Sequence, residues 1–362
     1  MEGEINYFMS VAALSKKFLF FLLSFIMLIS FVGCSTNKSV KNIESKKINY
    51  NNIYEFMHSG FWVDNNSIYY RKSGLYNNLY YYADNSGNHL ITTNNKFNIS
   101  VAKDIEGQIS GEIQAFGDYV YFWYERISEN REQNDLYQYN IKSKKFKKVL
   151  SVNQNVSEWT IFENMVLYSC FINGKDENIN SLWCGVIDSK ELPIKIADET
   201  TAFGIRKNKI VYTQKDNAAQ SILYEYDYQS KESVKLCSFV GIYENYNPYN
   251  FTDSSVVFAT DKLQVVDIET GVQKSFDLSG YTEFFNCYEE YAFACINSNI
   301  YRINVLTGES KLVSDKLKEC VLIYAISDEC AVAISYKNSG FRTKVEVCAI
   351  YADGRTEKIF NI

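Results

Sequence analysis

Short apolar segments recur along the chain from Asn51 to the C-terminus, and polar turns flank each of them. One residue from each segment gives the series Ile68, Val120, Val166, Ile210, Val256, Ala292 and Ala331, with spacings of 52, 46, 44, 46, 36 and 39 residues. Short apolar runs bounded by turn residues are typical of strands rather than helices. We therefore predict strands at residues 68–70, 120–124, 165–168, 210–212, 256–258, 291–294 and 331–334.

A second strand follows most of these and opens with Leu-Tyr or a similar pair. It occupies residues 79–82, 136–139, 182–185, 223–226 and 300–303. Weaker strands precede and follow each pair, and the intervening turns, such as Gly117-Asp118 and Asp353-Gly354, have residues that suit hairpins. Each repeat therefore predicts four antiparallel strands.

All-strand repeats of about 45 residues predict an all-β protein, a β-propeller of four-stranded antiparallel blades. The most apolar strands are apolar on both faces, so both faces must be covered, as they are when each sheet packs between two neighbours. We predict seven blades over residues 52–362, with six blades plus a decorated edge as the alternative. Thr356 to Phe360 would supply the outer strand of the last blade, so closure of the ring needs no N-terminal strand.

Composition agrees with strands and narrows the range of partners. Tyr (29) and Phe (24) are abundant while Pro (2) is scarce, which suits strands rather than disorder. The net charge is −6, and the charges are spread without acidic or basic blocks. Because no basic face is expected to displace counterions, we expect no nucleic-acid partner. We also expect a monomer.

The N-terminus has the pattern of an export signal. Lys16 and Lys17 precede an apolar run, residues 18–32, that is short for a membrane-spanning helix. We therefore predict a signal peptide over residues 1–33. Met9 is an alternative start, because the acidic residues before it are unusual ahead of such a signal.

The end of the apolar run, Phe31-Val32-Gly33-Cys34, resembles the lipobox of bacterial lipoproteins, although that pattern usually has Leu in place of Phe31. The resemblance implies cleavage after Gly33 and a lipid on the sulfur of Cys34. Residues 34–51 would then form a polar tether. We expect an acylated (palmitate-carrying) protein on the outer face of the cytoplasmic membrane. An uncleaved signal anchor and ordinary secretion are the alternatives, and both also place the body outside.

The repeats resemble those of uncharacterised propeller lipoproteins of Gram-positive bacteria, which are similar to the propellers of low-density-lipoprotein receptors. The resemblance covers the whole repeat region and depends on the periodic pattern, not on a catalytic motif. It implies the fold and export, and it implies no particular substrate.

Candidate catalytic chemistry is sparse in this sequence. The sequence has only two histidines, His58 and His89, and this scarcity argues against a Ser-His-Asp site and against a histidine-rich metal site. No phosphate-loop or calcium-loop motif is present, so we predict no metal and no cofactor. Cys170 and Cys184 flank one hairpin and are the candidate disulfide pair; cysteines in apolar strands otherwise behave as small buried apolar residues.

We expect ligands at the face where the longer loops emerge, because loops on a rigid scaffold carry function. The candidate ligand-binding residues are Glu125, Glu129, Tyr243, Tyr246 and Tyr249. Tyrosine rings beside amides suit the faces of sugars or a peptide partner. The alternative is that the glutamates are solvated loop residues and that Tyr246 and Tyr249 pack inside the fold.

The missing catalytic residues and the uneven loops favour a non-catalytic module that binds or organises a protein or a cell-wall glycan. On this basis the chain is expected not to be an enzyme. The alternative is a propeller enzyme, a polysaccharide hydrolase or lyase that uses Glu, Asp and Tyr at the mouth of the channel.

Overall fold

A computed structural model describes residues 61–361, except 65–66, 73–78, 85–86, 104, 106, 111–112, 127–132, 172–179, 218–219, 242–248, 260–261, 279, 281, 316, 318–319 and 340–341. Most of these residues lie in antiparallel strands, which confirms the all-β propeller fold predicted from the repeats. The signal, Cys34 and the tether lie outside the described residues.

The first two sheets come from the N-terminal part. The first contains β1 (Phe61–Asp64), β2 (Ser67–Lys72), β3 (Leu79–Asp84) and β4 (Gly87–Thr93). The second contains β5 (Gly107–Ile109), β6 (Gln114–Phe116), β7 (Tyr119–Arg126), β8 (Gln133–Asn140) and β9 (Lys145–Val152). Both β5 and β6 pair with β7, so together they form one interrupted inner strand.

The third sheet is a double unit. It contains β10 (Val156–Phe162), β11 (Met165–Phe171), β12 (Asn180–Val186), β13 (Ile194–Arg206), β14 (Lys209–Asn217), β15 (Gln220–Asp227) and β16 (Glu232–Val240). The long strand β13 pairs with β12 through its first half and with β14 through its second half. It therefore closes one four-stranded unit and opens the next.

Three four-stranded sheets complete the chain. The fourth contains β17 (Asn250–Phe251), β18 (Ser255–Ala259), β19 (Lys262–Asp267) and β20 (Gln273–Asp277). The fifth contains β21 (Thr282–Tyr288), β22 (Tyr291–Ile296), β23 (Asn299–Asn304) and β24 (Ser310–Ser314). The last contains β25 (Cys320–Ser327), β26 (Cys330–Ser339), β27 (Arg342–Tyr351) and β28 (Thr356–Asn361).

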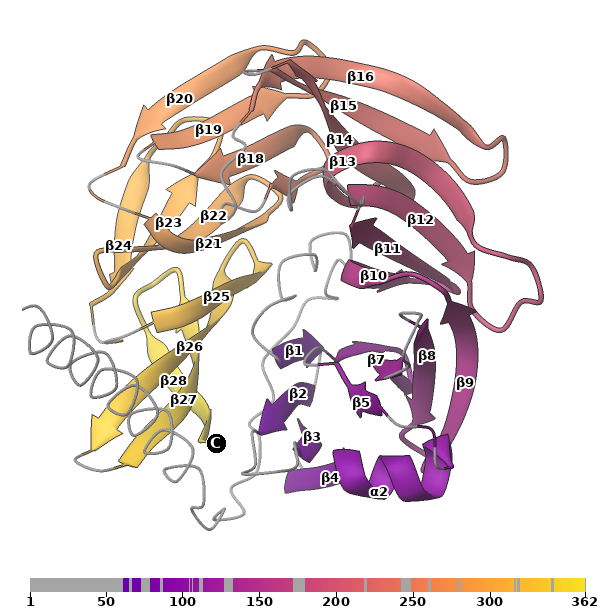
Figure 1. Ribbon diagram of the computed structural model, residues 1–362. Coiled ribbons are helices and arrows are strands. Elements are labelled where there is room, and N and C mark those ends of the chain that lie inside the picture. The colour runs from indigo at the N-terminus through magenta and orange to yellow at the C-terminus, as the bar shows by residue number, and fades with distance from the viewer. Residues whose placement is uncertain are drawn as a thin grey trace, which may run out of the picture.

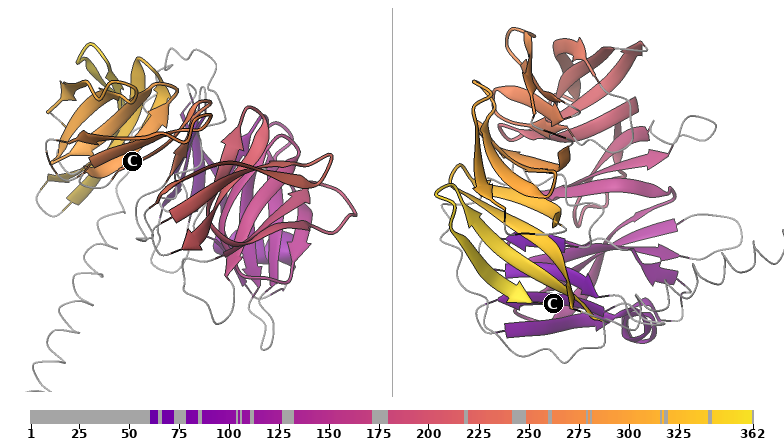
Figure 2. Two further views of the ribbon diagram at one scale, coloured as in Figure 1. Left: turned by 90° about the horizontal axis from the view of Figure 1, so that it is seen from above. Right: turned by 90° about the vertical axis from the view of Figure 1, so that its left-hand side faces the viewer.

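The sheets follow one another in chain order around a common centre, so that the indigo first sheet comes to lie near the yellow last one (Figure 1). Seen from above, the orange and yellow sheets form one group and the magenta sheets another (Figure 2). If β13 is counted in both of its units, the strands group in seven sets of four, but the blade number itself stays a prediction.

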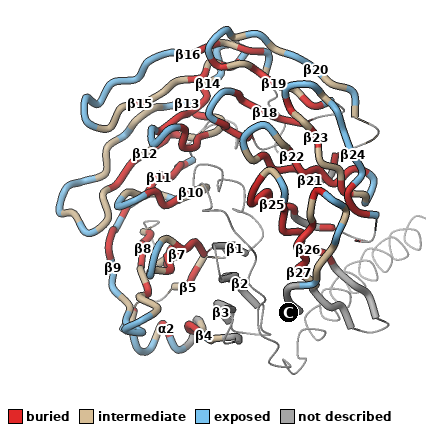
Figure 3. The backbone as a smooth tube through the Cα atoms, turned by 180° about the vertical axis from the view of Figure 1, so that it is seen from behind, coloured by how far each residue is buried: buried red, intermediate tan, exposed pale blue. Residues whose placement is uncertain are grey.

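The most apolar strand of each repeat is the second strand of its sheet, for example β7. Alternate residues of such a strand enter different cores, which explains why these strands are apolar on both faces. In β7, Phe122 and Tyr124 pack in the core shared with the last sheet, whereas Tyr121 and Trp123 pack against the third sheet. Side chains of a strand point alternately to its two faces, so each sheet supplies two cores. Figure 3 shows this burial in red along the inner strands, with pale blue on turns and outer strands.

The Leu-Tyr motif has a packing explanation. Its first residue is fully buried in β8, β12 and β15, as Leu136, Leu182 and Leu223. The next residue faces the other way, and in β12 it is Trp183, whose ring lies under Lys195 of the outer strand at 5.7 Å. The motif therefore marks a fully buried position followed by an aromatic ring on the other face, which is half-buried at Trp183 and Tyr224 and buried at Tyr137.

Two features of the fold escaped the sequence pattern. A short helix α2 (Asn94–Phe97) and a π-helical turn η3 (Asn98–Ala102) connect the first sheet to the second, where only strands were expected. Phe97 is fully buried among Phe122, Tyr137 and Phe146, with ring centroids 4.9 to 5.4 Å from its own. An aromatic residue on this helix therefore fills a gap that a strand would otherwise occupy.

Candidate functional site

The two rims of the ring differ in how they are built. Turns between first and second strands, and between third and fourth strands, emerge on one rim, which we call the turn face. Loops between second and third strands, and the connections from sheet to sheet, emerge on the other rim, which we call the loop face. This division follows from antiparallel pairing of successive strands in every sheet.

The turn face is tied together from sheet to sheet. Arg206 Nε donates to the carbonyl oxygen of Asp253 at 2.9 Å, and Arg302 Nε donates to that of Asp328 at 2.6 Å. The same Arg302 lies over the ring of Tyr291, 3.5 Å from its centroid. Charged donors that hold the carbonyl groups of the next sheet make this face a structural one.

On the loop face, the second sheet carries a buried ion pair. Asp135, at the start of β8, has a side chain that is 1% exposed. It accepts hydrogen bonds from Arg126 Nε at 2.7 Å, from Arg126 Nη2 and from the Ser151 hydroxyl, and Lys148 Nζ lies 3.7 Å away. Arg126 comes from β7 and Ser151 from β9, so the Asp135 carboxylate holds the ends of three strands together.

Glu125 lies in a different place from the one expected. The sequence places it in a loop, but β7 continues through Arg126, and Glu125 pairs with Asn134 of β8. Its carboxylate is partly exposed and accepts a hydrogen bond from Gln108 Nε2 at 3.1 Å. Glu125 is thus a carboxylate on a rigid strand end, and Glu129 lies outside the described residues.

Three hydroxyl groups on the loop face are buried without a hydrogen-bond partner within the described part of the chain. They belong to Thr200, Ser221 and Thr282, from the third and fifth sheets. A buried hydroxyl without a partner costs roughly 1–3 kcal/mol, and in a folded protein it calls for an explanation. Sequence reasoning missed these residues; the available signal was a small polar residue near the end of an otherwise apolar strand.

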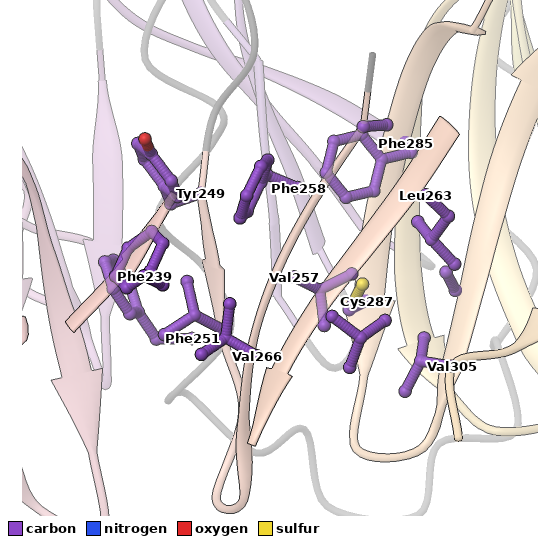
Figure 4. Packing of buried hydrophobic residues seen from close by; sticks show 14 of the residues in the cluster. Phe239, Tyr249, Phe251, Val257, Phe258, Leu263, Val266, Phe285, Cys287 and Val305 are labelled. Carbon is purple, nitrogen blue, oxygen red and sulfur yellow. The ribbon is translucent and has the colours of Figure 1, made fainter. Parts of the chain in front are cut away.

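Tyr249 packs inside the fold, which was the alternative to its binding a ligand. Its side chain is 7% exposed and lies among Phe239, Phe251 and Phe258, with ring centroids 5.1 to 6.5 Å away (Figure 4). A sugar or peptide therefore has no access to its ring face. Tyr243 and Tyr246 lie outside the described residues and stay candidates.

The connection from β16 to β17 contains Tyr243, Tyr246 and Tyr249, and its two ends meet at Ser221. A Cβ atom built on Gly241 would lie 2.3 Å from Ser221 Oγ and 2.9 Å from Tyr249 Oη. Because real Cβ atoms do not approach so closely, a glycine is needed where the connection leaves β16. The unpartnered hydroxyl of Ser221 thus lies at the base of this connection.

The disulfide expected between Cys170 and Cys184 is wrong. Both are free thiols, and they lie on opposite faces of the same sheet, in two different cores. Cys170 Sγ contacts Gln154 Oε1 at 3.5 Å, and Cys184 Sγ contacts Met165 Sδ at 3.8 Å. Burial raises the pKa of each thiol to about 12, so neither is a reactive thiolate at neutral pH.

Within the described ranges, no group of three or more His, Cys, Asp or Glu side chains could hold a metal ion. Among the same residues, no helix has the length and apolar character needed to cross a membrane. His89 lies in β4 opposite Tyr82, and His58 is outside the described part.

No protein-family model and no curated protein matches this chain. Among solved structures, the acylaminoacyl peptidase of Pyrococcus horikoshii is 12% identical, with a TM-score of 0.58 over 88% of this chain and 54% of that one. A prolyl endopeptidase is 10% identical, with a TM-score of 0.56 over 87% of this chain and 50% of that one. The chain spans about half the length of these two peptidases.

A further similar structure is a propeller domain by itself. The β-propeller domain of the Trilobed protease from Pyrococcus furiosus is 11% identical, with a TM-score of 0.50 over 70% of this chain and 85% of that one. Together with the sheets described above, this likeness defines the class of the protein. It is a β-propeller.

These structures correct the expectation that the chain is not an enzyme. The solved structures that match this fold include a prolyl endopeptidase, an acylaminoacyl peptidase and a puromycin hydrolase. The expected non-catalytic module is left without support. A scarcity of histidines excludes only the sites that use them, and a propeller can belong to a catalytic protein without carrying such a site itself.

Proposed function

We propose that this chain is an exported β-propeller that binds a polymeric substrate at its loop face and takes part in the cleavage of that substrate. The observation that carries the proposal is the set of unpartnered hydroxyls at Thr200, Ser221 and Thr282, all near that face. A ligand rich in hydroxyl and amide groups would supply the missing hydrogen bonds once the side chains above them move aside, because all three hydroxyls are closed to solvent in this fold. The occurrence of the fold in hydrolytic enzymes supports the catalytic part.

A cell-wall glycan is the first candidate substrate. Glycoside cleavage needs carboxyl groups at defined positions, and Glu125 is a carboxylate fixed on a strand end at the loop face. Asp135 is bound by Arg126 and Ser151, so its role is to position the strand ends. We therefore assign the first test of acid or base chemistry to Glu125.

A peptide is the second candidate substrate. It is favoured by the peptidases among the similar structures and by the length of this chain, which matches about half of theirs. In that case the propeller would bind or orient a peptide for a peptidase partner. The two candidates differ in which polymer is bound and cut.

The place of action belongs to the same proposal. The apolar run before Gly33 and Cys34 supports export, with a lipid on Cys34 holding a monomeric propeller on the outer face of the cytoplasmic membrane. Blocking acylation by Cys34→Ala should abolish palmitate labelling of the chain. Unchanged labelling would remove the anchor from the proposal.

The test of the binding site compares two threonines. In Thr200→Val the lost hydroxyl has no partner, so stability to denaturant should be unchanged or higher, while binding to purified peptidoglycan should weaken about three- to tenfold. In the control, Thr213→Val, the lost hydroxyl contacts Thr201 Oγ1 at 2.9 Å and the Ala202 carbonyl at 3.4 Å. The control should lose about 1 kcal/mol of stability and keep its affinity.

Cleavage is measured separately, as release of soluble fragments from peptidoglycan and from a peptide mixture. Glu125→Gln should lower glycan release at least tenfold and leave binding intact. A wild-type chain that binds and cuts neither polymer would overturn the proposed function. Binding that is identical in Thr200→Val would overturn the proposed site.

A further inference from the structure

A lysine-rich segment lies on the outer edge of the second sheet. We call it the lysine edge; it comprises Lys142, Lys144, Lys145, Lys147 and Lys148, in the turn before β9 and in β9 itself. All five side chains are exposed. The outer strands β16, β20, β24 and β28 contain one lysine each, at 235, 274, 311 and 358. Lysine on an edge strand discourages edge-to-edge pairing of sheets. The other outer strands achieve this with one lysine each, so that role does not account for the larger number in and before β9.

Only part of this charge is compensated. Lys142 Nζ lies 2.6 Å from Asp118 Oδ2, Lys147 pairs with Asp188, and Lys148 Nζ lies 3.7 Å from Asp135 Oδ1. Lys144 and Lys145 form no ion pair within the part of the chain that the structure describes. The edge is therefore a local positive surface on a protein whose net charge is −6.

Exposed apolar side chains lie beside the lysine edge. Phe146, within β9, packs against Phe97 at 5.4 Å between ring centroids, which brings α2 and η3 next to this strand. On these two short helical turns, Lys96 is exposed and Ile99 is 77% exposed. A large apolar side chain held in solvent three residues from an exposed lysine, next to a lysine-rich strand, is the composition of a surface that lies in a membrane interface.

We propose that the lysine edge, with Lys96 and Ile99, docks onto the headgroup region of an anionic phospholipid bilayer. Lys144 and Lys145 would contact lipid phosphates, and Ile99 would enter the interface. The proposal rests on the outward, membrane-attached placement proposed above. The segment from Cys34 to Phe61 spans 27 residues (61 − 34), so a reach of up to roughly 90 Å lets the second sheet touch the membrane that holds the chain.

The contact would orient the propeller. A lipid on Cys34 alone leaves the body free to rotate on its tether, whereas a second, basic contact restricts it. Each lysine near an anionic surface strengthens attachment about fivefold. The orientation would hold one rim of the ring at a set distance from the bilayer and leave the loop face open to a polymer outside.

The experiment measures which lysines the membrane protects. The full-length protein is reconstituted into vesicles of phosphatidylcholine alone or with 30% phosphatidylglycerol, then treated with an amine acetylating reagent and read by mass spectrometry. Acetylation of Lys144, Lys145 and Lys96 should fall at least about threefold on the anionic vesicles only. Lys274, on the outer strand of a distant sheet, should react equally on both.

A charge-reversal variant and a fluorescent label give independent checks. In Lys144→Glu/Lys145→Glu, protection of Lys96 on anionic vesicles should disappear, whereas the control Lys274→Glu should keep it. A bimane label on Ile99→Cys should shift to the blue on anionic vesicles, while a label on Val272→Cys, a 55% exposed residue just before β20 of the fourth sheet, should not. The eight described native thiols are buried and will not compete for the label.

Equal protection on both kinds of vesicle, or none, would overturn the proposal. Protection produced by soluble teichoic acid and not by anionic vesicles would also overturn it, because the partner would then be a wall polymer. Polymer binding and cleavage do not enter these measurements, so the membrane contact and the proposed function fail separately.

Discussion

At the scale of single residues, the spaces between sheets are built to exclude charge. The thiols of Cys170, Cys184 and Cys330 and the phenol of Tyr121 are buried there, and desolvation raises the pKa of each to about 12. Their ordinary values are 9.0 for the thiols and 10.0 for tyrosine. All four groups are therefore neutral over the physiological range, and their conversion to anions would oppose folding.

This predicts a loss of stability in alkali. A folded-state pKa above the unfolded value favours the protonated group, so the three thiols stabilise the fold fully below about pH 9 and lose that contribution as the pH rises toward 12. Urea midpoints measured at pH 7, 8 and 10.5 should be nearly equal at the first two values and lower at the third. In Cys184→Ala the drop should be smaller, although the starting stability is lower; a drop of the same size would contradict the assignment.

At the scale of elements, buried amides join the inner strands of neighbouring sheets. Gln114 of β6 donates from Nε2 to the carbonyl of Trp159 at 2.7 Å, and its Oε1 accepts from the Ile161 amide at 3.0 Å, both in β10. Asn286 of β21 accepts from the Ala325 amide of β25 at 2.9 Å. Strands of different sheets have no ladder between them, so these side chains take over that role.

Replacing one amide should therefore weaken the contact between two sheets. Asn286→Leu leaves the Ala325 amide buried without its acceptor, which should cost about 1–3 kcal/mol and speed hydrogen exchange at Ala325. The control is Gln264→Leu, whose Nε2 donates to Ser275 Oγ at 2.9 Å within one sheet near solvent. The control should cost less than about 0.5 kcal/mol. Exchange at Ala325 that does not change would argue against the link.

At the scale of the whole molecule, packing closes the ring, and among the described strands none is exchanged between the first and last sheets. The first sheet uses only β1–β4 and the last only β25–β28, as expected from the apolar segment at Thr356 to Phe360. Ile91 of the first sheet, Tyr324 and Val332 of the last, and Val120 of the second belong to one buried core. Since no ladder joins the first and last sheets within the part of the chain that the structure describes, this core carries the closure.

Truncating a side chain at the closure should destabilise the whole protein. Ile326 is buried in that core, so Ile326→Ala should lower the free energy of unfolding by about 2–4 kcal/mol in a single transition. Val234→Ala, at an exposed position of β16, should change it by less than about 0.5 kcal/mol. An early separate transition in Ile326→Ala would mean that the last sheet unfolds independently and that the ring is not cooperative.

The strands and turns could be predicted from the sequence because their signals depend only on neighbouring residues. Residues 120–124 and 331–334 are apolar at every position, and each lies in a second strand with both faces covered. Gly117-Asp118 and Asp353-Gly354 form the predicted turns. In contrast, the residues next to Glu125 and Tyr249 in the sequence do not reveal where these side chains lie. Glu125 is on a strand because β7 continues through Arg126. Tyr249 is buried because it packs in the core around Phe239.

The sequence by itself determined the repeat, the strand positions and the class of fold, since alternation along a strand depends only on neighbouring residues. Tertiary structure decided which residues share a face or a core. It put Cys170 and Cys184 on opposite sides of a sheet, left the hydroxyl of Thr200 without a partner, and gathered the lysines of one edge beside Ile99. These outcomes depend on contacts between segments far apart in the chain, and no local pattern encodes them.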